Sequence, residues 1–143
     1  MSPKVYLCGP INGYTDQEAA EWREYAKEHL LLETLDPMVK DYRGREAENT
    51  YNIVENDKDD IAECHILLVN HPRPFTGTDM VIDQVTAPME VMYAWIQGKQ
   101  IIAVVPLETV ISPWLSHHAT GLFTSMDDAI NYINTNWGRN YRG

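Results

Sequence analysis

The chain has 143 residues, of which 44% are hydrophobic, 10% aromatic and 22% charged, a composition that excludes a disordered or fibrous protein. Eleven lysines and arginines against 21 aspartates and glutamates give a formal net charge of −10, which argues against sequence-independent binding of a nucleic-acid polymer. The apolar runs are too short to cross a bilayer and the two cysteines form no disulfide framework, so we expect one cytoplasmic domain over residues 1–143.

The first half of the chain alternates short β-type runs with helical ones. Residues 5–8 predict a strand that ends at Gly9-Pro10. Thr15 to Glu18 has the pattern of a capping box, and apolar residues then recur at helical spacing up to about Leu32. A weaker strand is expected at 33–35, and the polar stretch 38–49 is expected to be a loop.

The second half continues this alternation. A surface helix is predicted at 51–63, a buried strand at 65–70, and an apolar helix at 87–97 that Gly98 closes in a left-handed conformation. Another apolar strand is expected at 100–106 and a last helix from Ser125, while 71–86 and 108–119 are expected to be loops.

Strands that alternate with helices predict a parallel sheet covered on both faces. The chain length suits a flavodoxin-like, doubly wound α/β fold with a mostly parallel five-stranded sheet. Ligands of such sheets bind beyond the carboxyl ends of the strands. The loops at 9–15, 38–49, 71–86 and 108–119 are therefore the places to look for a site.

Glu90 is the most unusual residue of the sequence. It is the one carboxylate in the first turns of the apolar helix 87–97, directly after a loop at the expected ligand edge. Burial would raise its pKa, whereas the helix N-terminus favours the charged form. The alternative is an exposed helix-start glutamate, but this helix has almost no polar face on which it could lie.

Two further features point to the same edge. Backbone N–H groups in the turn 9–13 are suited to holding a sugar hydroxyl or a phosphate, although a plain tight turn explains them equally well. Of the acids Asp57, Asp59 and Asp60, the first shares a helix face with Ile61 and is the best placed to turn inward.

His117 and His118 are adjacent and accompanied by no metal-binding motif, so no metal site is predicted.

Four pieces of the sequence, taken in order, resemble the nucleoside 2-deoxyribosyltransferase family. They are Val5-Tyr6-Leu7-Cys8-Gly9-Pro10, Asp57-x-x-x-Ile61, Ile66-Leu67-Leu68-Val69 and Met89-Glu90-x-x-Tyr93-Ala94-x-x-x-Gly98-Lys99. The resemblance implies a flavodoxin-like fold, no metal or organic cofactor, and homo-oligomers (dimers or larger) whose sites are completed across subunits. It also implies small-molecule substrates, namely a 2′-deoxynucleoside or deoxynucleotide and a free nucleobase.

The resemblance assigns three catalytic roles. Glu90 falls on the nucleophile, which attacks the anomeric carbon and forms a covalent deoxyribosyl-enzyme. Tyr6 falls on the tyrosine that orients this carboxylate. Asp57 falls on the acid that donates a proton to the leaving base.

Further residues are expected to bind the substrate. Gly9 and Pro10 belong to the loop that lines the deoxyribose, and Asp41 falls near a base-contacting position. Asp83, or alternatively Asp79, is placed to face the base. Ser112 falls where a neighbouring subunit contributes a group near the 5′ end of the sugar.

The function expected from this resemblance is transfer of a deoxyribosyl group between nucleobases. The alternative is hydrolysis of a 2′-deoxynucleoside 5′-monophosphate, because the related N-glycosidases share the Tyr-x-Cys-Gly opening. The segment Gln84-Val85-Thr86-Ala87-Pro88 departs from the usual loop before the nucleophile. The loop therefore does not decide whether the substrate is a nucleoside or a nucleotide. A third interpretation is a non-catalytic nucleotide-binding module on the same scaffold.

Overall fold

The computed structural model describes residues 3–9, 16–39, 45, 47–71, 86–107 and 111–138. Its sheet contains five strands, all parallel, in the order β2-β1-β3-β4-β5. The strands are β1 (Lys4–Cys8), β2 (Glu33–Leu35), β3 (Ile66–Asn70), β4 (Gln100–Val104) and β5 (Gly121–Phe123). The expected flavodoxin-like α/β fold is therefore confirmed, because this strand order is the flavodoxin order.

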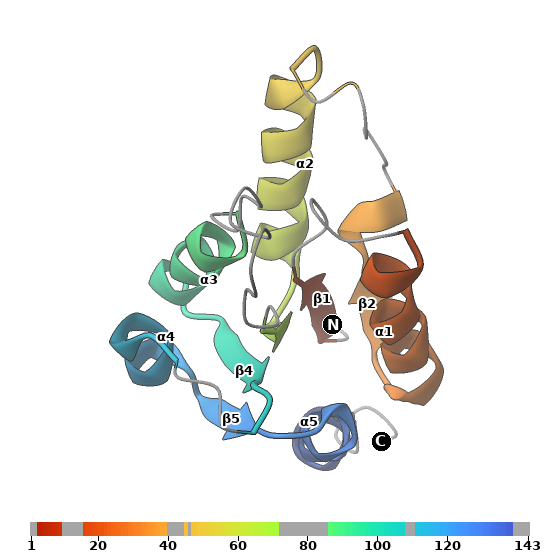
Figure 1. Cartoon of the computed structure of the whole chain (residues 1–143), viewed down its shortest axis with the longest axis vertical. Coiled ribbons are helices and arrows are strands. Elements are labelled where there is room, and N and C mark those ends of the chain that lie inside the picture. The colour runs from red at the N-terminus through yellow and green to blue at the C-terminus, as the bar shows by residue number, and fades with distance from the viewer. Residues whose placement is uncertain are drawn as a thin grey trace, which may run out of the picture.

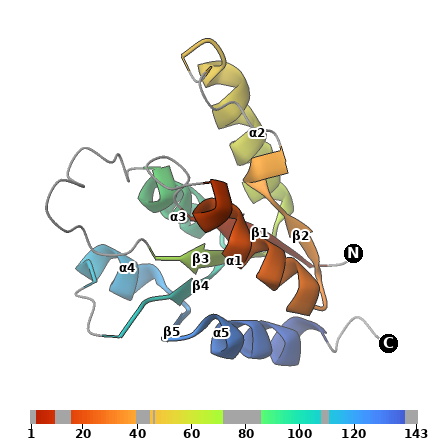
Figure 2. The same ribbon diagram turned by 45° about the vertical axis from the view of Figure 1, so that its right-hand side comes forward.

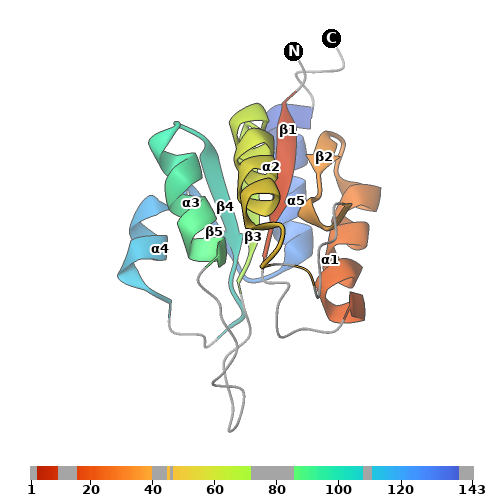
Figure 3. The same ribbon diagram turned by 90° about the horizontal axis from the view of Figure 1, so that it is seen from above.

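Helices cover both faces of this sheet (Figure 1). They are α1 (Asp16–His29), α2 (Thr50–Glu63), α3 (Thr86–Ile96), α4 (Pro113–His118) and α5 (Met126–Ile133), with a short 3₁₀ turn η1 (Pro37–Val39) and a π turn η3 (Asn134–Gly138). Figure 3 shows α2 and α3 in front of the strands and α5 behind them. In Figure 2 the first turns of α2 stand out from the body of the fold.

Side-chain alternation along the strands divides the core into two layers. Val5 and Leu7 of β1 pack with residues of α1 and α5 on one face, whereas Tyr6 and Cys8 pack with residues of α2 and α3 on the other. All four side chains are fully buried. Successive strand residues point to opposite faces, so the odd-numbered residues of β1 contact one helix layer and the even-numbered residues contact the other.

Several local expectations are confirmed. Gly98 ends the α3 turn with φ of +79°, a conformation that suits glycine, and Ser125 caps α5 by accepting a hydrogen bond from the backbone N–H of Asp128 at 3.1 Å. Ile61 lies in the core with 1% exposure, as its helix position predicted. The expected capping box of α1 begins at Thr15, which lies outside the described residues.

Other expectations need correction. Residues 113–118, expected to be loop, form α4, and Met38 and Val39, also expected to be loop, belong to η1. The edge strand β5 was not predicted, and the strand expected at 100–106 ends at Val104. These short elements escape periodicity because three to six residues give too few repeats to define a face.

No helix in the described part of the chain combines the length and apolarity needed to span a membrane. Within the same residues, no three His, Cys, Asp or Glu side chains converge in a way that could hold a metal ion.

Candidate active site

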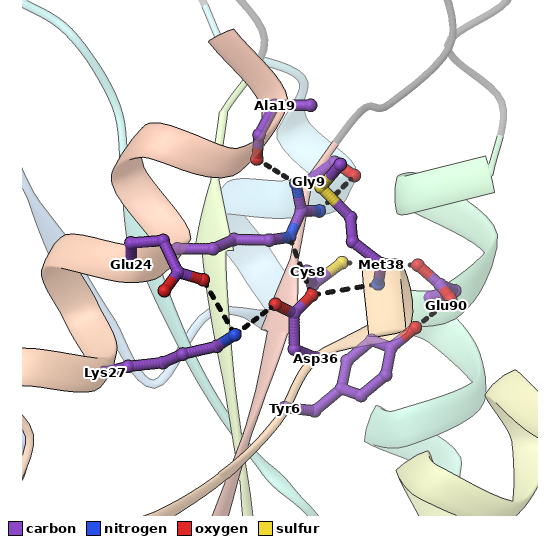
Figure 4. Close-up of polar contacts among 10 residues, drawn as sticks. Tyr6, Cys8, Gly9, Ala19, Glu24, Lys27, Asp36, Met38 and Glu90 are labelled. Atoms are coloured by element: carbon purple, nitrogen blue, oxygen red, sulfur yellow. Dashed lines mark hydrogen bonds and ion pairs between the residues drawn. The ribbon is translucent and has the colours of Figure 1, made fainter. Parts of the chain in front are cut away.

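Glu90 lies in the second turn of α3, beside the residues by which the helix packs on the sheet. Ala87, Val91 and Ala94 form that packing stripe and are buried. Glu90 is partly buried next to them, and its carboxylate points toward β1, where Tyr6 and Cys8 contact it (Figure 4). Glu90 is therefore not a solvated helix-start glutamate.

Two donors from β1 hold the two oxygens of this carboxylate. The Tyr6 hydroxyl donates to Oε2 of Glu90 across 2.6 Å, a length typical of a hydroxyl that donates to a carboxylate. The Cys8 thiol donates to Oε1 across 3.6 Å. Because Tyr6 and Cys8 are two residues apart on a strand, both side chains project to the same face of the sheet.

Asp57 of α2 is the second carboxyl group at this position. Its side chain lies within hydrogen-bonding reach of Glu90, and its charge acts on both Glu90 and Tyr6. Asp57 lies one helical turn before buried Ile61, which faces the core. Two neighbouring carboxyl groups repel each other when both are ionised, which favours a form in which one of them holds a proton.

These surroundings shift the pKa values of the group. Burial, aided by the charge of Asp57, raises the pKa of Glu90 to about 7, while the hydrogen bonds from Tyr6 and Cys8 act in the opposite direction. Burial next to Glu90 raises the pKa of the Tyr6 phenol and that of the Cys8 thiol well above their ordinary values. Tyr6 and Cys8 therefore remain protonated donors, while the carboxyl pair exchanges its proton near neutral pH.

A buried arginine supports the end of β1 that leads to the site. Arg23 of α1 is fully buried, and its Nη1 and Nη2 donate to the backbone carbonyls of Ala19 (2.6 Å) and Gly9 (2.9 Å). Its Nε lies 3.7 Å from Oδ1 of Asp36, and Lys27 binds the other oxygen of Asp36 at 2.7 Å. Figure 4 shows this network beside Cys8 and Tyr6. It ties α1, β1 and the end of β2 together.

Gly9 packs closely against α1, because it has no side chain. A Cβ on Gly9 would lie 2.9 Å from Cζ2 of Trp22 and 3.4 Å from the carbonyl oxygen of Asn70. The first distance is shorter than van der Waals contact allows. A side chain at position 9 would therefore require the Trp22 ring or the backbone at the carboxyl end of β1 to shift.

The structure brings together only some of the residues predicted from the sequence. Tyr6, Asp57 and Glu90 form one cluster, and Gly9 follows Cys8 at the end of β1. Pro10, Asp41 and Asp83 lie outside the described residues. Ser112 is exposed at the start of α4, where its hydroxyl oxygen accepts a hydrogen bond from the backbone N–H of Trp114 at 3.1 Å.

Sequence reasoning missed three residues of this region. Cys8 was assigned no role of its own, although it lies on the same strand face as Tyr6. Arg23 occupies a position on the inward stripe of α1 formed by Ala19, Ala26 and Leu30, where an ion is unexpected. Asp36, the partner of Arg23, carries no sequence signal beyond its place after β2.

No model of a known protein family matches the sequence, and no curated protein sequence matches it either. Solved structures do match over nearly the whole chain. A 2-deoxyribosyltransferase from Bacillus psychrosaccharolyticus superposes with a TM-score of 0.69 at 18% identity, covering 90% of this chain and 91% of its own. One from Leishmania mexicana gives 0.65 at 18% identity, covering 94% and 98%.

A third match is a CMP N-glycosidase from Clostridium botulinum, with a TM-score of 0.56 at 12% identity over 92% of this chain and 98% of that one. The fold implied by the sequence resemblance is therefore the fold of solved 2-deoxyribosyltransferases and of an N-glycosidase. At these identities the likeness establishes the fold, and the activity has to be argued from the side chains.

Proposed function

We propose that this protein is a nucleoside 2-deoxyribosyltransferase, which cleaves the N-glycosidic bond of a 2′-deoxynucleoside and transfers the sugar to another nucleobase. The observation that carries the proposal is the position of Glu90, which two donors from β1 hold beside the carboxyl group of Asp57. A module that only binds nucleotides has no use for two partly buried carboxyls that share one proton, since their proximity destabilises the fold.

The reaction proceeds in two displacements. Asp57 donates its proton to the leaving base, the C1′–N bond breaks with its electron pair on the base, and Glu90 bonds to C1′. In the second step an incoming base attacks C1′, the bond to Glu90 breaks, and Asp57 recovers a proton from that base. Each step inverts the sugar, so the product retains the configuration of the substrate.

The proton count of the carboxyl pair sets the active form. The reaction needs an ionised Glu90 and a protonated Asp57, so the pair must hold one proton. A pair that loses this proton near pH 7, as the pKa of Glu90 indicates, has no acid to offer the leaving base above that pH. The alkaline limb of kcat/KM is therefore expected close to neutral pH.

The basic residues favour a neutral nucleoside over a nucleotide. Five of the six lysines and arginines in the described part of the chain contact the protein's own acids or carbonyls: Lys4, Arg23, Lys27, Lys58 and Lys99. The sixth is Arg45, and the other basic residues of the chain lie outside the described residues: Lys40, Arg43, Arg73, Arg139 and Arg142. A 5′-hydroxyl needs no cation, whereas a 5′-phosphate gains strong charge-assisted hydrogen bonds from Arg or Lys.

Further parts of the site are proposals of the same kind. We place Gly9 and Pro10 against the deoxyribose, Asp41 and Asp83 against the base, and Ser112 in the site of a neighbouring subunit. The protein is then a homo-oligomer, which analytical ultracentrifugation measures directly. A monomer that is fully active at assay concentration contradicts the shared site.

An exchange assay tests the function itself. Thymidine mixed with free adenine should yield deoxyadenosine, and Glu90→Ala should abolish this product while the circular dichroism spectrum stays unchanged. A 2-fluoro-arabinosyl nucleoside should leave a sugar adduct on the peptide that contains Glu90. Deoxynucleoside 5′-monophosphates are assayed in parallel. Release of free base and sugar phosphate from these alone overturns the transferase in favour of an N-glycosidase.

A further inference from the structure

We propose that Cys8 is a positioning residue for Glu90: its thiol donates to Oε1 and, together with Tyr6, keeps Glu90 as the ionised member of the carboxyl pair. The proton that the pair shares then resides on Asp57. The catalytic consequence rests on the function proposed above, whereas the contact between Cys8 and Glu90 does not.

The geometry of β1 carries this inference. Cys8 is fully buried at the carboxyl end of the strand, and the pleat directs its side chain to the face where Tyr6 and Glu90 meet. The Tyr6 hydroxyl occupies Oε2 of Glu90 at 2.6 Å, which leaves Oε1 for the thiol at 3.6 Å. Each oxygen of the carboxylate therefore has its own donor, and the two donors come from one rigid strand.

The thiol has one proton and two acceptors within reach. The carbonyl oxygen of Ala87 lies 3.9 Å from the Cys8 sulfur, slightly farther than Oε1 of Glu90. A carboxylate is a stronger acceptor than a carbonyl, so the thiol donates to Glu90 when that residue is ionised. A protonated Glu90 accepts less strongly, so the thiol can then turn to Ala87.

This difference favours one of the two arrangements of the shared proton. Donors stabilise the ionised form of the group to which they point, so Tyr6 and Cys8 both favour an ionised Glu90. The hydrogen bond from Cys8 accordingly lowers the pKa of Glu90 against the larger effect of burial. An ionised Glu90 beside a protonated Asp57 is the form in which the nucleophile and the acid are both ready.

Groups from three elements bear on the titration of Glu90. Tyr6 and Cys8 project from β1, Asp57 from α2, and the buried guanidinium of Arg23 on α1 interacts with Glu90 through its charge. Burial and the charge of Glu90 raise the pKa of the Cys8 thiol well above its ordinary value, so the thiol does not ionise in the range where Glu90 titrates. Cys8 thus acts by donating its proton in a hydrogen bond and never as a thiolate.

The kinetic test compares Cys8→Ala with Cys64→Ala. Cys64 is the second buried cysteine of the same core layer, and its thiol donates to the carbonyl of Ile61 at 3.1 Å, away from Glu90. Cys8→Ala should lower kcat about fivefold with little change in KM and should move the alkaline limb of kcat/KM to higher pH. Cys64→Ala should leave that limb in place.

A spectroscopic test does not depend on turnover. In the Cys64→Ala protein the remaining S–H stretching band belongs to Cys8. The thiol donates to an ionised Glu90 whether or not Asp57 holds its proton, so the band should stay at one low frequency as the pH rises through about 7. In a protein that also carries Glu90→Gln, the thiol has only neutral acceptors within reach and the band should move to higher frequency. This measurement remains available if Cys8→Ala fails to fold.

The two measurements separate this inference from the proposed function. An S–H band that Glu90→Gln leaves unchanged, or that moves to lower frequency as the pH rises through about 7, overturns the role of Cys8, even if base exchange is observed. A low-frequency band that Glu90→Gln raises, in a protein without exchange activity, supports the contact and contradicts the transferase function instead. An alkaline limb that is equal in the parent protein and in an active Cys8→Ala variant also overturns the inference.

Discussion

The hydroxyl of Tyr6 donates to Oε2 of Glu90 across 2.6 Å, although the two residues lie 84 positions apart in the chain. The contact joins a central strand of the sheet to the first turns of the helix that follows β3. Tyr6 is fully buried, so its hydroxyl depends on a partner inside the protein, and Glu90 supplies it. One hydrogen bond thus satisfies a buried donor and fixes the proposed nucleophile.

Tyr6→Phe removes this donor and keeps the ring that packs in the core. We expect kcat to fall about 10- to 100-fold, the range for losing one hydrogen bond to a charged group. The pKa of Glu90 should rise further, because the bond from Tyr6 now lowers it, and the alkaline limb of kcat/KM should move to higher pH. An unchanged pH profile would show that Tyr6 does not act on Glu90.

Asp57→Asn removes the proposed acid and the charge beside Glu90. Turnover of ordinary deoxynucleosides should fall at least about 100-fold, the contribution typical of general acid catalysis. A deoxynucleoside whose base is already cationic, such as the 7-methylguanine derivative, needs no proton and should be affected much less. Asp59→Asn is the matched control, because Asp59 is an exposed acid on the same helix. Equal losses for both leaving groups would remove Asp57 from proton transfer.

Glu90→Gln tests the linkage between stability and pH. The pKa of Glu90 is about 7 in the folded protein, above the ordinary glutamate value of 4.5, so folding favours the form in which Glu90 and Asp57 hold one proton between them. The parent protein should therefore lose stability as the pH rises from about 4.5 to about 7, and the variant should not share this loss. The Tm of Glu90→Gln relative to the parent should increase between about pH 5 and about pH 8.

Arg23→Met tests the buried network behind Gly9. The guanidinium is fully buried, and its removal takes a donor from the carbonyls of Ala19 and Gly9 and leaves Asp36 with the Lys27 ammonium and the backbone N–H of Met38. We expect a loss of about 3 kcal/mol in the free energy of unfolding, measured by urea denaturation. Lys27→Met is the control, since the Lys27 side chain is 30% exposed and its pairs should contribute less than about 1 kcal/mol.

Gly9→Ala places a methyl group against the indole of Trp22, at a distance of 2.9 Å from Cζ2. The ring or the strand end must shift, so both Tm and kcat/KM should decrease, because Gly9 follows the strand that carries Tyr6 and Cys8. Adding Trp22→Phe removes the ring atoms in the way and should restore part of the lost stability. A Gly9→Ala protein as stable and active as the parent would contradict the close packing.

Much of this fold could be predicted from the spacing of apolar residues. The alternation of strands and helices predicted the parallel sheet. The glycine after the apolar helix predicted that α3 stops before Gly98, which has a left-handed conformation. The position of Asp57 one turn before Ile61 gave its inward orientation. These features are local, because each depends on residues within a few positions of one another.

The edge of the sheet was harder to predict. β5 has three residues and lies at the edge of the sheet, where β4 is its neighbour. The conformation of β5 therefore depends on pairing with β4 more than on its own sequence. α4 spans six residues between Ser112 and Ala119, too few for a helical face to show in the sequence.

The sequence by itself determined the layers of the fold and drew attention to Asp57 and Glu90, because periodicity indicates which side chains turn inward. Tyr6 entered only through the family resemblance. Only the tertiary structure decided which inward side chains meet. It placed the Cys8 thiol on Glu90 and buried Arg23 behind Gly9, contacts that depend on how helices from distant parts of the chain dock on one strand. Periodicity carries no information about docking, since it describes one element at a time.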